Sequence, residues 1–207
     1  MELNLIITGV GGQGNVLASQ VLGQAAVQKG LRVTIGETFG LSQRGGPVLS
    51  HVRLSDSRLK GPIIPPNGAH IMVGLEPLEP VRILKEFGNE KTIFIVNSRP
   101  IHPLNVIAGE AAYPEEAWLK ETLQSFGSRL FWLDGTELAI SLGGAIMLNM
   151  IMLGALTAID HFPVSTSDIK QVVRDIFPAS KVDLNDQALD MGRSLISASI
   201  QSDGKGP

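Results

Sequence analysis

The chain has 207 residues, of which 43% are hydrophobic, and carries a formal net charge of −3 at pH 7. This length and composition predict one compact domain, and the lack of basic clusters excludes an electrostatic footprint for nucleic acid or for an anionic membrane surface. The chain contains no cysteine, which excludes disulfides, thiolate nucleophiles and cysteine-ligated iron–sulfur clusters held by this chain alone.

The first quarter of the sequence predicts a strand, a helix and two more strands. Residues 3–8 form an apolar run that glycines end, and residues 15–29 repeat apolar side chains at helical spacing. Residues 31–37 and 48–55 alternate apolar and polar side chains, as half-buried strands do. The order strand, helix, strand predicts a β-α-β unit, with loops at 38–47 and 56–68.

The rest of the sequence alternates short apolar strands with helices. We expect strands at 69–74, 92–97 and 130–133, and helices at 78–87, 114–126, 145–158, from a capping box at 165–168, and at 185–200. The fold class is therefore α/β: a single three-layer, Rossmann-like domain over residues 1–200, with a mostly parallel sheet covered by helices on both faces. Residues 201–207 are expected to form a disordered tail.

Residues 138–159 contain no charged side chain and are long enough to span a bilayer. Polar and small residues interrupt the segment and no Lys or Arg flanks it, so a buried helix is favoured over a membrane span. Its methionines, Met147, Met150 and Met152, fit either ordinary core or a flat apolar interface with a partner. Because the N-terminus also lacks a signal-peptide pattern, we expect a cytoplasmic protein without membrane contact.

A glycine-rich turn follows the first strand. Gly9, Gly11 and Gly14 fit the frame G-x-G-x-x-G, and the N–H groups at the start of the next helix would favour an anion. Glu37 ends the second strand, where a dinucleotide-binding fold places its ribose-binding acid. The turn alone leaves two interpretations open: a nicotinamide or flavin site, and a turn that needs glycine for packing.

A second glycine-bearing loop follows the second strand and contains Arg44, Gly45 and Gly46. In a parallel sheet both loops would lie at the carboxyl edge of adjacent strands, where ligands usually bind. Arg44 could bind a phosphate or carboxylate, or it could pair with Glu37 and shape the loop.

Together these stretches resemble the gamma domain of the 2-oxoacid:ferredoxin oxidoreductases. The resemblance rests on GVGGQGNVLASQVLGQAA (9–26), GETFGLSQRGGPVLSHVR (36–53) and GLEPLE (74–79), and it covers almost the whole chain. The motifs SQRGG and SHVR are most similar to the separate-chain form found in the indolepyruvate branch of that family.

The resemblance implies one subunit of an enzyme that oxidatively decarboxylates a 2-oxoacid to an acyl-CoA, and that is inactive alone. Thiamine diphosphate, magnesium and the iron–sulfur clusters would be held by a large partner subunit, which passes electrons to ferredoxin. Coenzyme A would be the co-substrate. By resemblance, its phosphate or the partner's active-site mouth would lie beside Gly11, Gly12, Gln13, Gly14, Arg44, Gly45 and Gly46. The alternative function is a free-standing nucleotide-binding module or an NAD(P)-dependent oxidoreductase.

Other candidate side chains carry weaker signals. The histidines His51, His70, His102 and His161 share no ligand spacing, so no metal site is expected in the chain. His51 is either a ligand or partner contact or a hydrogen-bonded strand histidine. Glu76 would cap the helix that begins at residue 78 or face the cleft at the sheet edge.

Overall fold

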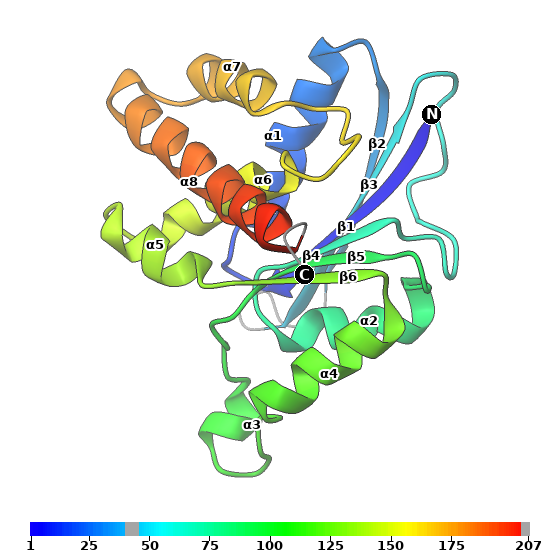
Figure 1. Ribbon diagram of the computed structural model, residues 1–207, viewed down its shortest axis with the longest axis vertical. Coiled ribbons are helices and arrows are strands. Elements are labelled where there is room, and N and C mark those ends of the chain that lie inside the picture. The colour runs from blue at the N-terminus through cyan, green and yellow to red at the C-terminus, as the bar shows by residue number, and fades with distance from the viewer. Residues whose placement is uncertain (40–45, 204–207) are drawn as a thin grey trace.

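The computed structural model describes residues 1–39 and 46–203, and in these residues six strands form one mixed sheet (Figure 1). The strands are β1 (Glu2–Val10), β2 (Arg32–Phe39), β3 (Pro47–Ser55), β4 (Ile71–Gly74), β5 (Ile93–Asn97) and β6 (Arg129–Leu133). Their order across the sheet is β2-β3-β1-β4-β5-β6. β1, β4, β5 and β6 run parallel, whereas β3 is antiparallel to its neighbours β1 and β2.

Helices cover both faces of this sheet and give the three layers expected from the sequence (Figure 1). In the described residues they are α1 (Asn15–Gln28), α2 (Leu78–Phe87), α3 (Leu104–Ile107), α4 (Glu116–Phe126), α5 (Gly135–Ser141), the short 3-10 helix η1 (Ala145–Met147), α6 (Leu148–Leu156), α7 (Thr166–Ile176) and α8 (Ala179–Asp203). α1, α6, α7 and α8 pack on one face, and α2 and α4 pack on the other.

Side chains that alternate along the strands form two apolar cores, one on each face of the sheet. On β1, Leu5 and Ile7 are buried beneath α1 and α6, while Ile6 between them is buried on the α2 side. Because successive strand residues point to opposite faces, a strand covered on both faces reads as a continuous apolar run. The predicted α/β class with a mostly parallel sheet is confirmed.

The uncharged segment 138–159 belongs to the core. All nine residues of α6 are buried, and the segment is divided into α5, η1 and α6. α6 lies against α8 so closely that a Cβ on Gly192 would be 1.8 Å from the carbonyl oxygen of Ile151. No helix in the described part of the chain is long and apolar enough to cross a membrane.

The position of β3 corrects the predicted β-α-β unit. The sequence predicts β2 beside β1, but β3 lies between them and is antiparallel to both. Only residues 40–46 join β2 to β3, which is too short for the crossover that a parallel neighbour requires, so β3 turns back into the space beside β1.

Three helices also differ from the sequence prediction. α3 and α5 are short and were not predicted, because each offers too few periodic apolar positions. α8 begins at Ala179 rather than at residue 185, and it extends to Asp203, three residues into the predicted tail. Residues 204–207 of that tail lie outside the described residues.

Candidate functional site

The turn between β1 and α1 needs glycine for its backbone. Gly12 and Gly14 have φ angles of +103° and +83°, in the left-handed region that residues with a Cβ rarely adopt. Within the described residues, the N–H groups of Gly12 and Gly14 make no hydrogen bond, and no side chain caps α1. The turn therefore presents unpaired donors at the positive end of a helix dipole.

Gln13 shapes this turn from within. Its side-chain Oε1 accepts a hydrogen bond from the N–H of Val10 at 2.8 Å, and its Nε2 donates to the carbonyl oxygen of Leu75 at 2.8 Å. These bonds tie the end of β1 to the segment after β4. Gln13 thus acts as a brace that holds these two segments together, and both polar atoms of its side-chain amide are already hydrogen-bonded.

The second glycine motif meets the first. The N–H of Gly11 donates to the carbonyl oxygen of Gly46 at 2.8 Å, so the structure brings these two predicted residues together across the sheet edge. Arg44 and Gly45, the other predicted residues of this motif, lie outside the described residues.

A cleft of about 630 Å³ opens beside the glycine turn, at the carboxyl ends of β1 and β5. Its walls come from the turn, the start of α1, the residues after β5, and the starts of α5, η1 and α6. The apolar side chains lining it include Leu17, Ile101, Ile146 and Leu148. α1 leaves β1 toward one face of the sheet and α2 leaves β4 toward the other, so the cleft lies at a topological switch point, where open α/β sheets bind ligands.

Two of the cleft's polar side chains are satisfied internally. The Nδ2 of Asn97 donates to Leu75 and to the hydroxyl of Thr136, and its Oδ1 accepts from the N–H of Thr136 at 3.1 Å. The hydrogen bonds between Asn97 and Thr136 therefore connect the end of β5 to the start of α5 along one wall of the cleft.

Asn149 differs, because it is 2% exposed and its Oδ1 has no hydrogen-bond partner among the described residues. Its amide packs on the glycine turn: a Cβ on Gly14 would lie 2.3 Å from Nδ2. A buried acceptor without a partner costs about 1–3 kcal/mol. No local sequence pattern marks Asn149, because its burial is set by tertiary packing.

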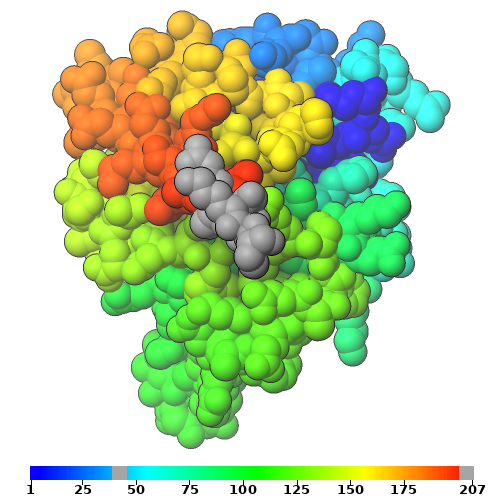
Figure 2. Space-filling model, viewed as in Figure 1, coloured from blue at the N-terminus to red at the C-terminus, as the bar shows by residue number. Residues whose placement is uncertain are grey.

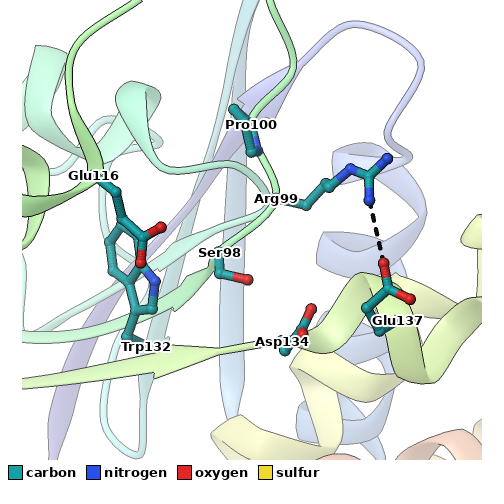
Figure 3. Close-up of a pocket in the computed structure, with 7 residues that line it drawn as sticks. All are labelled: Ser98, Arg99, Pro100, Glu116, Trp132, Asp134 and Glu137. Atoms are coloured by element: carbon teal, nitrogen blue, oxygen red, sulfur yellow. Dashed lines mark hydrogen bonds and ion pairs between the residues drawn. The ribbon is translucent and has the colours of Figure 1, made fainter.

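Arg99 lies on the border between this cleft and a second, polar pocket of about 450 Å³. Figure 3 shows the second pocket, which is lined by Ser98, Arg99, Pro100, Glu116, Trp132, Asp134 and Glu137. The Nη1 of Arg99 reaches across to Glu137 of α5 at 3.2 Å, and both side chains are 59% exposed. The single sequence signal for Arg99 is its place just after the strand 92–97, which puts it at the carboxyl edge of the sheet.

Glu37 does not face the cleft. It lies on β2, which β3 separates from β1, and its carboxylate accepts hydrogen bonds from the hydroxyls of Ser19 at 2.7 Å and Ser50 at 2.6 Å. The expectation that the two glycine loops follow adjacent strands is therefore wrong, and Glu37 has internal partners instead of a ribose.

Glu76 caps α2, as one of its two predicted roles required. One carboxylate oxygen accepts from the N–H of Glu79 in the first turn, and the other accepts from the hydroxyl of Tyr113 at 2.8 Å. Burial raises the pKa of Glu76. Burial likewise raises the pKa of Glu79 to about 7, with the charge of Glu76 acting in the same direction and Arg82 opposing it.

His51 and His70 occupy structural positions, whereas His102 and His161 are exposed. His51 is buried on the α2 face, with its ring 5.0 Å from that of Phe87 in an edge contact, and burial lowers its pKa with help from the charge of Arg53. The Nδ1 of His70 accepts from the backbone N–H of Asn4. Over residues 1–39 and 46–203, no three His, Asp or Glu side chains gather in a way that could hold a metal ion.

Comparison with known proteins identifies what this chain is similar to. The family model described as pyruvate ferredoxin/flavodoxin oxidoreductase matches residues 4–195. The chain is 38% identical over 192 residues to the indolepyruvate oxidoreductase subunit IorB of Pyrococcus horikoshii, covering 92% of this chain and 94% of the relative. The IorB subunit of Archaeoglobus fulgidus is also 38% identical, covering 93% and 94%.

A solved structure shares the fold at lower sequence identity. The pyruvate oxidoreductase subunit PORC from Thermotoga maritima superimposes with a TM-score of 0.71 at 22% identity, covering 93% of this chain and 96% of that one. The sheet and both helical layers therefore recur in a chain of nearly the same extent.

Proposed function

The chain belongs to the pyruvate ferredoxin/flavodoxin oxidoreductase family and is a subunit of a 2-oxoacid:ferredoxin oxidoreductase, and on this premise we propose that it serves an enzyme that oxidises indolepyruvate or a related arylpyruvate. The observation that carries the proposal is the 38% identity to IorB subunits over more than nine-tenths of the chain. Identity to the pyruvate synthase subunit PorC of Methanothermobacter marburgensis is 25% over 183 residues, which favours the aryl branch.

We propose that a larger subunit of the hetero-oligomer holds thiamine diphosphate, magnesium and the iron–sulfur clusters, and passes electrons to ferredoxin in the cytoplasm. The composition of this chain supports the assignment of the clusters to the larger subunit, because this chain has no cysteine to ligate a cluster. This chain would contribute a binding surface, and the complex would release carbon dioxide and form an acyl-CoA.

The segment around α3 supports contact with a large partner. It projects from the body of the protein beyond α4 (Figures 1 and 2), and Leu104 and Ile107 within it are 80% and 70% exposed. Ile146 at the mouth of the cleft is 72% exposed. Large apolar side chains at such exposure are typical of surfaces that another chain covers. We therefore place the partner over α3 and the mouth of the cleft.

We further propose that the glycine turn, Gly11, Gly12, Gln13 and Gly14, borders the coenzyme A phosphate or the partner's active-site mouth, together with Arg44, Gly45 and Gly46. The unpaired N–H groups of Gly12 and Gly14 and the contact between Gly11 and Gly46 support this location. Because the side chain of Gln13 is already hydrogen-bonded to Val10 and Leu75, this residue would shape the turn and not bind the ligand directly.

The test is reconstitution with the large subunit from the same organism. Reduction of ferredoxin by indolepyruvate and coenzyme A should require both chains, and pyruvate should be a poorer substrate. Arg44→Ala should weaken the dependence on coenzyme A, with Arg44→Lys as the charge-preserving control.

Three results would contradict the proposal or a part of it. Full activity of the large subunit without this chain would remove it from the enzyme. Tight binding of NAD(P) or a flavin by the isolated chain would instead favour a free-standing nucleotide-binding protein. Unchanged turnover and coenzyme A dependence in Arg44→Ala would exclude Arg44 from the site.

A further inference from the structure

The α3 arm, residues 100–114, leaves the body of the protein after β5 and returns at the start of α4 (Figure 1). None of its residues from 101 to 112 is buried, and Leu104 and Ile107 are 80% and 70% exposed. Holding a backbone in one conformation costs entropy, and here no buried side chain offsets that cost. The orientation of the arm therefore depends on how its two ends are attached.

One buried carboxylate connects both ends of the arm to the body. Glu76, which follows β4, is 1% exposed, and its Oε2 accepts a hydrogen bond from the hydroxyl of Tyr113 at 2.8 Å. Burial raises the pKa of Glu76, and hydrogen bonds from Tyr113 and from the backbone of Ile101 act in the opposite direction. Since Ile101 lies at the start of the arm and Tyr113 at its end, both ends direct a donor at the same carboxylate. The other oxygen accepts from the N–H of Glu79 and fixes Glu76 to α2.

Other contacts at the base of the arm are weaker. The rings of His102 and Tyr113 are 5.0 Å apart, which pairs the two ends of the arm with each other and not with the body. Beside Tyr113 a recess of about 100 Å³ remains unfilled, so dispersion contacts are lost there. Arg99 precedes the arm and pairs with Glu137, but both side chains are 59% exposed and water screens the pair. Among the described residues, the bond between Tyr113 and Glu76 is therefore the main polar attachment of the arm.

We propose that Tyr113 and Glu76 form a latch that holds the α3 arm in the orientation that the large subunit recognises, and that Leu104 and Ile107 bind an apolar recess of that subunit. The inference rests on the proposed function for the identity of the partner. It adds two positioning residues, neither of which needs to touch the partner.

The large subunit is the partner that the arm favours. The chain belongs to a family of oxidoreductase subunits, so it presents a surface to another subunit. The arm is continuous with the cleft, because Ile101 at its start also lines the cleft. Residues 101–112 carry one carboxylate, Glu110, and no Lys or Arg. The surface that receives them should therefore be apolar, as the centres of stable interfaces are.

A latch has a specific kinetic consequence. If the arm samples other orientations, only the molecules in the binding orientation associate, and the apparent affinity falls with their fraction. Loss of the latch should therefore slow association, whereas loss of an apolar contact should speed dissociation. Tyr113 remains a hydrogen-bond donor, because burial and the charge of Glu76 raise its pKa.

The experiment measures association and dissociation rates of the full chain with the large subunit from the same organism. Tyr113→Phe, which removes only the hydroxyl, should slow association about 5- to 20-fold with little change in dissociation. Leu104→Ala should instead speed dissociation about 10-fold. Leu59→Ala, at a side chain that is 64% exposed in the loop after β3, is the matched control and should change neither rate.

Two further variants separate the latch from a general effect on stability. Glu76→Gln can keep both contacts, since its Oε1 can accept from Glu79 and its Nε2 can donate to the Tyr113 hydroxyl, and it should retain most of the association rate. Replacement of residues 102–112 by a Gly-Ser linker should weaken association, and Tyr113→Phe should then cause no further loss. In the free chain, hydrogen exchange at the bonded amides of residues 106–111 should be faster in Tyr113→Phe than in the wild type.

The inference is overturned if Tyr113→Phe associates as fast as the wild type, or if it slows association further in the chain that carries the linker. Dimerisation of the isolated chain that Leu104→Ala abolishes would assign the exposed surface to a second copy, and this result also overturns the inference. Failure of the proposed function is distinguishable, because the wild-type chain would then not associate with the large subunit at all.

Discussion

Glu79 of α2 should give protein stability a pH dependence that can be measured without any ligand. Its side chain is 1% exposed, and burial raises its pKa from 4.5 to about 7 although Arg82 lies 2.8 Å away. The folded protein therefore holds this proton more tightly than the unfolded chain does. The stabilisation is fully present below pH 4.5 and is lost as the pH rises through about 7, a difference of about 3 kcal/mol.

Chemical denaturation between about pH 5 and pH 8 measures this effect. The free energy of unfolding of the wild type should fall across that range, and Glu79→Gln should remove most of the fall because glutamine stays neutral. Glu86→Gln, on the exposed side of the same helix, is the matched control and should keep the wild-type slope. A Glu79→Gln variant with that same slope would refute the argument. Glu76, whose pKa burial also raises, accounts for a residual fall in the same direction.

Three further substitutions test contacts that hold the fold together. Glu37→Ala leaves the Ser50 hydroxyl without its acceptor, while the Ser19 hydroxyl can still donate to the carbonyl oxygen of Val16, and it should lower the free energy of unfolding by about 2 kcal/mol in urea denaturation; a stability equal to the wild type would mean that the bond between Ser50 and Glu37 contributes nothing. Gln13→Ala removes the brace between the ends of β1 and β4 and should cost about 1–2 kcal/mol by the same measurement. Gly192→Ala should cost about 3 kcal/mol in thermal unfolding, because its Cβ would lie 1.8 Å from the oxygen of Ile151, while Gln187→Ala on the exposed side of α8 should leave the melting temperature unchanged.

Local patterns predicted most of the secondary structure. The apolar run over Leu5, Ile6 and Ile7 specifies a strand covered on both faces, and the structure buries all three. Ser165 and Asp168 form the predicted capping box, since each side chain accepts from the other's backbone N–H. Such features depend on residues close together in the chain, so their physical cause is visible in the sequence.

The cleft could not be predicted from local patterns, because it is formed by contacts between residues that are far apart in the chain. In the sequence, Asn149 is a single polar residue in an apolar helix. Only the packing of α6 in the folded protein places its amide against Gly14. Arg99 follows a predicted strand, but its place between two pockets depends on where α5 and η1 return to the sheet edge. The glycine turn was identified because backbone requirements restrict the sequence, whereas an unsatisfied acceptor is a property of the assembled fold.

The insertion of β3 explains why a dinucleotide-like glycine frame occurs here without a dinucleotide-like acid. With β3 between β1 and β2, Glu37 lies two strand spacings from β1, about 10 Å instead of about 5 Å. Its carboxylate is bonded to Ser19 and Ser50, so it offers nothing to a ribose beside the turn. The glycine frame therefore specifies a tight turn with unpaired donors at the start of α1, and this turn needs no acidic side chain on β2.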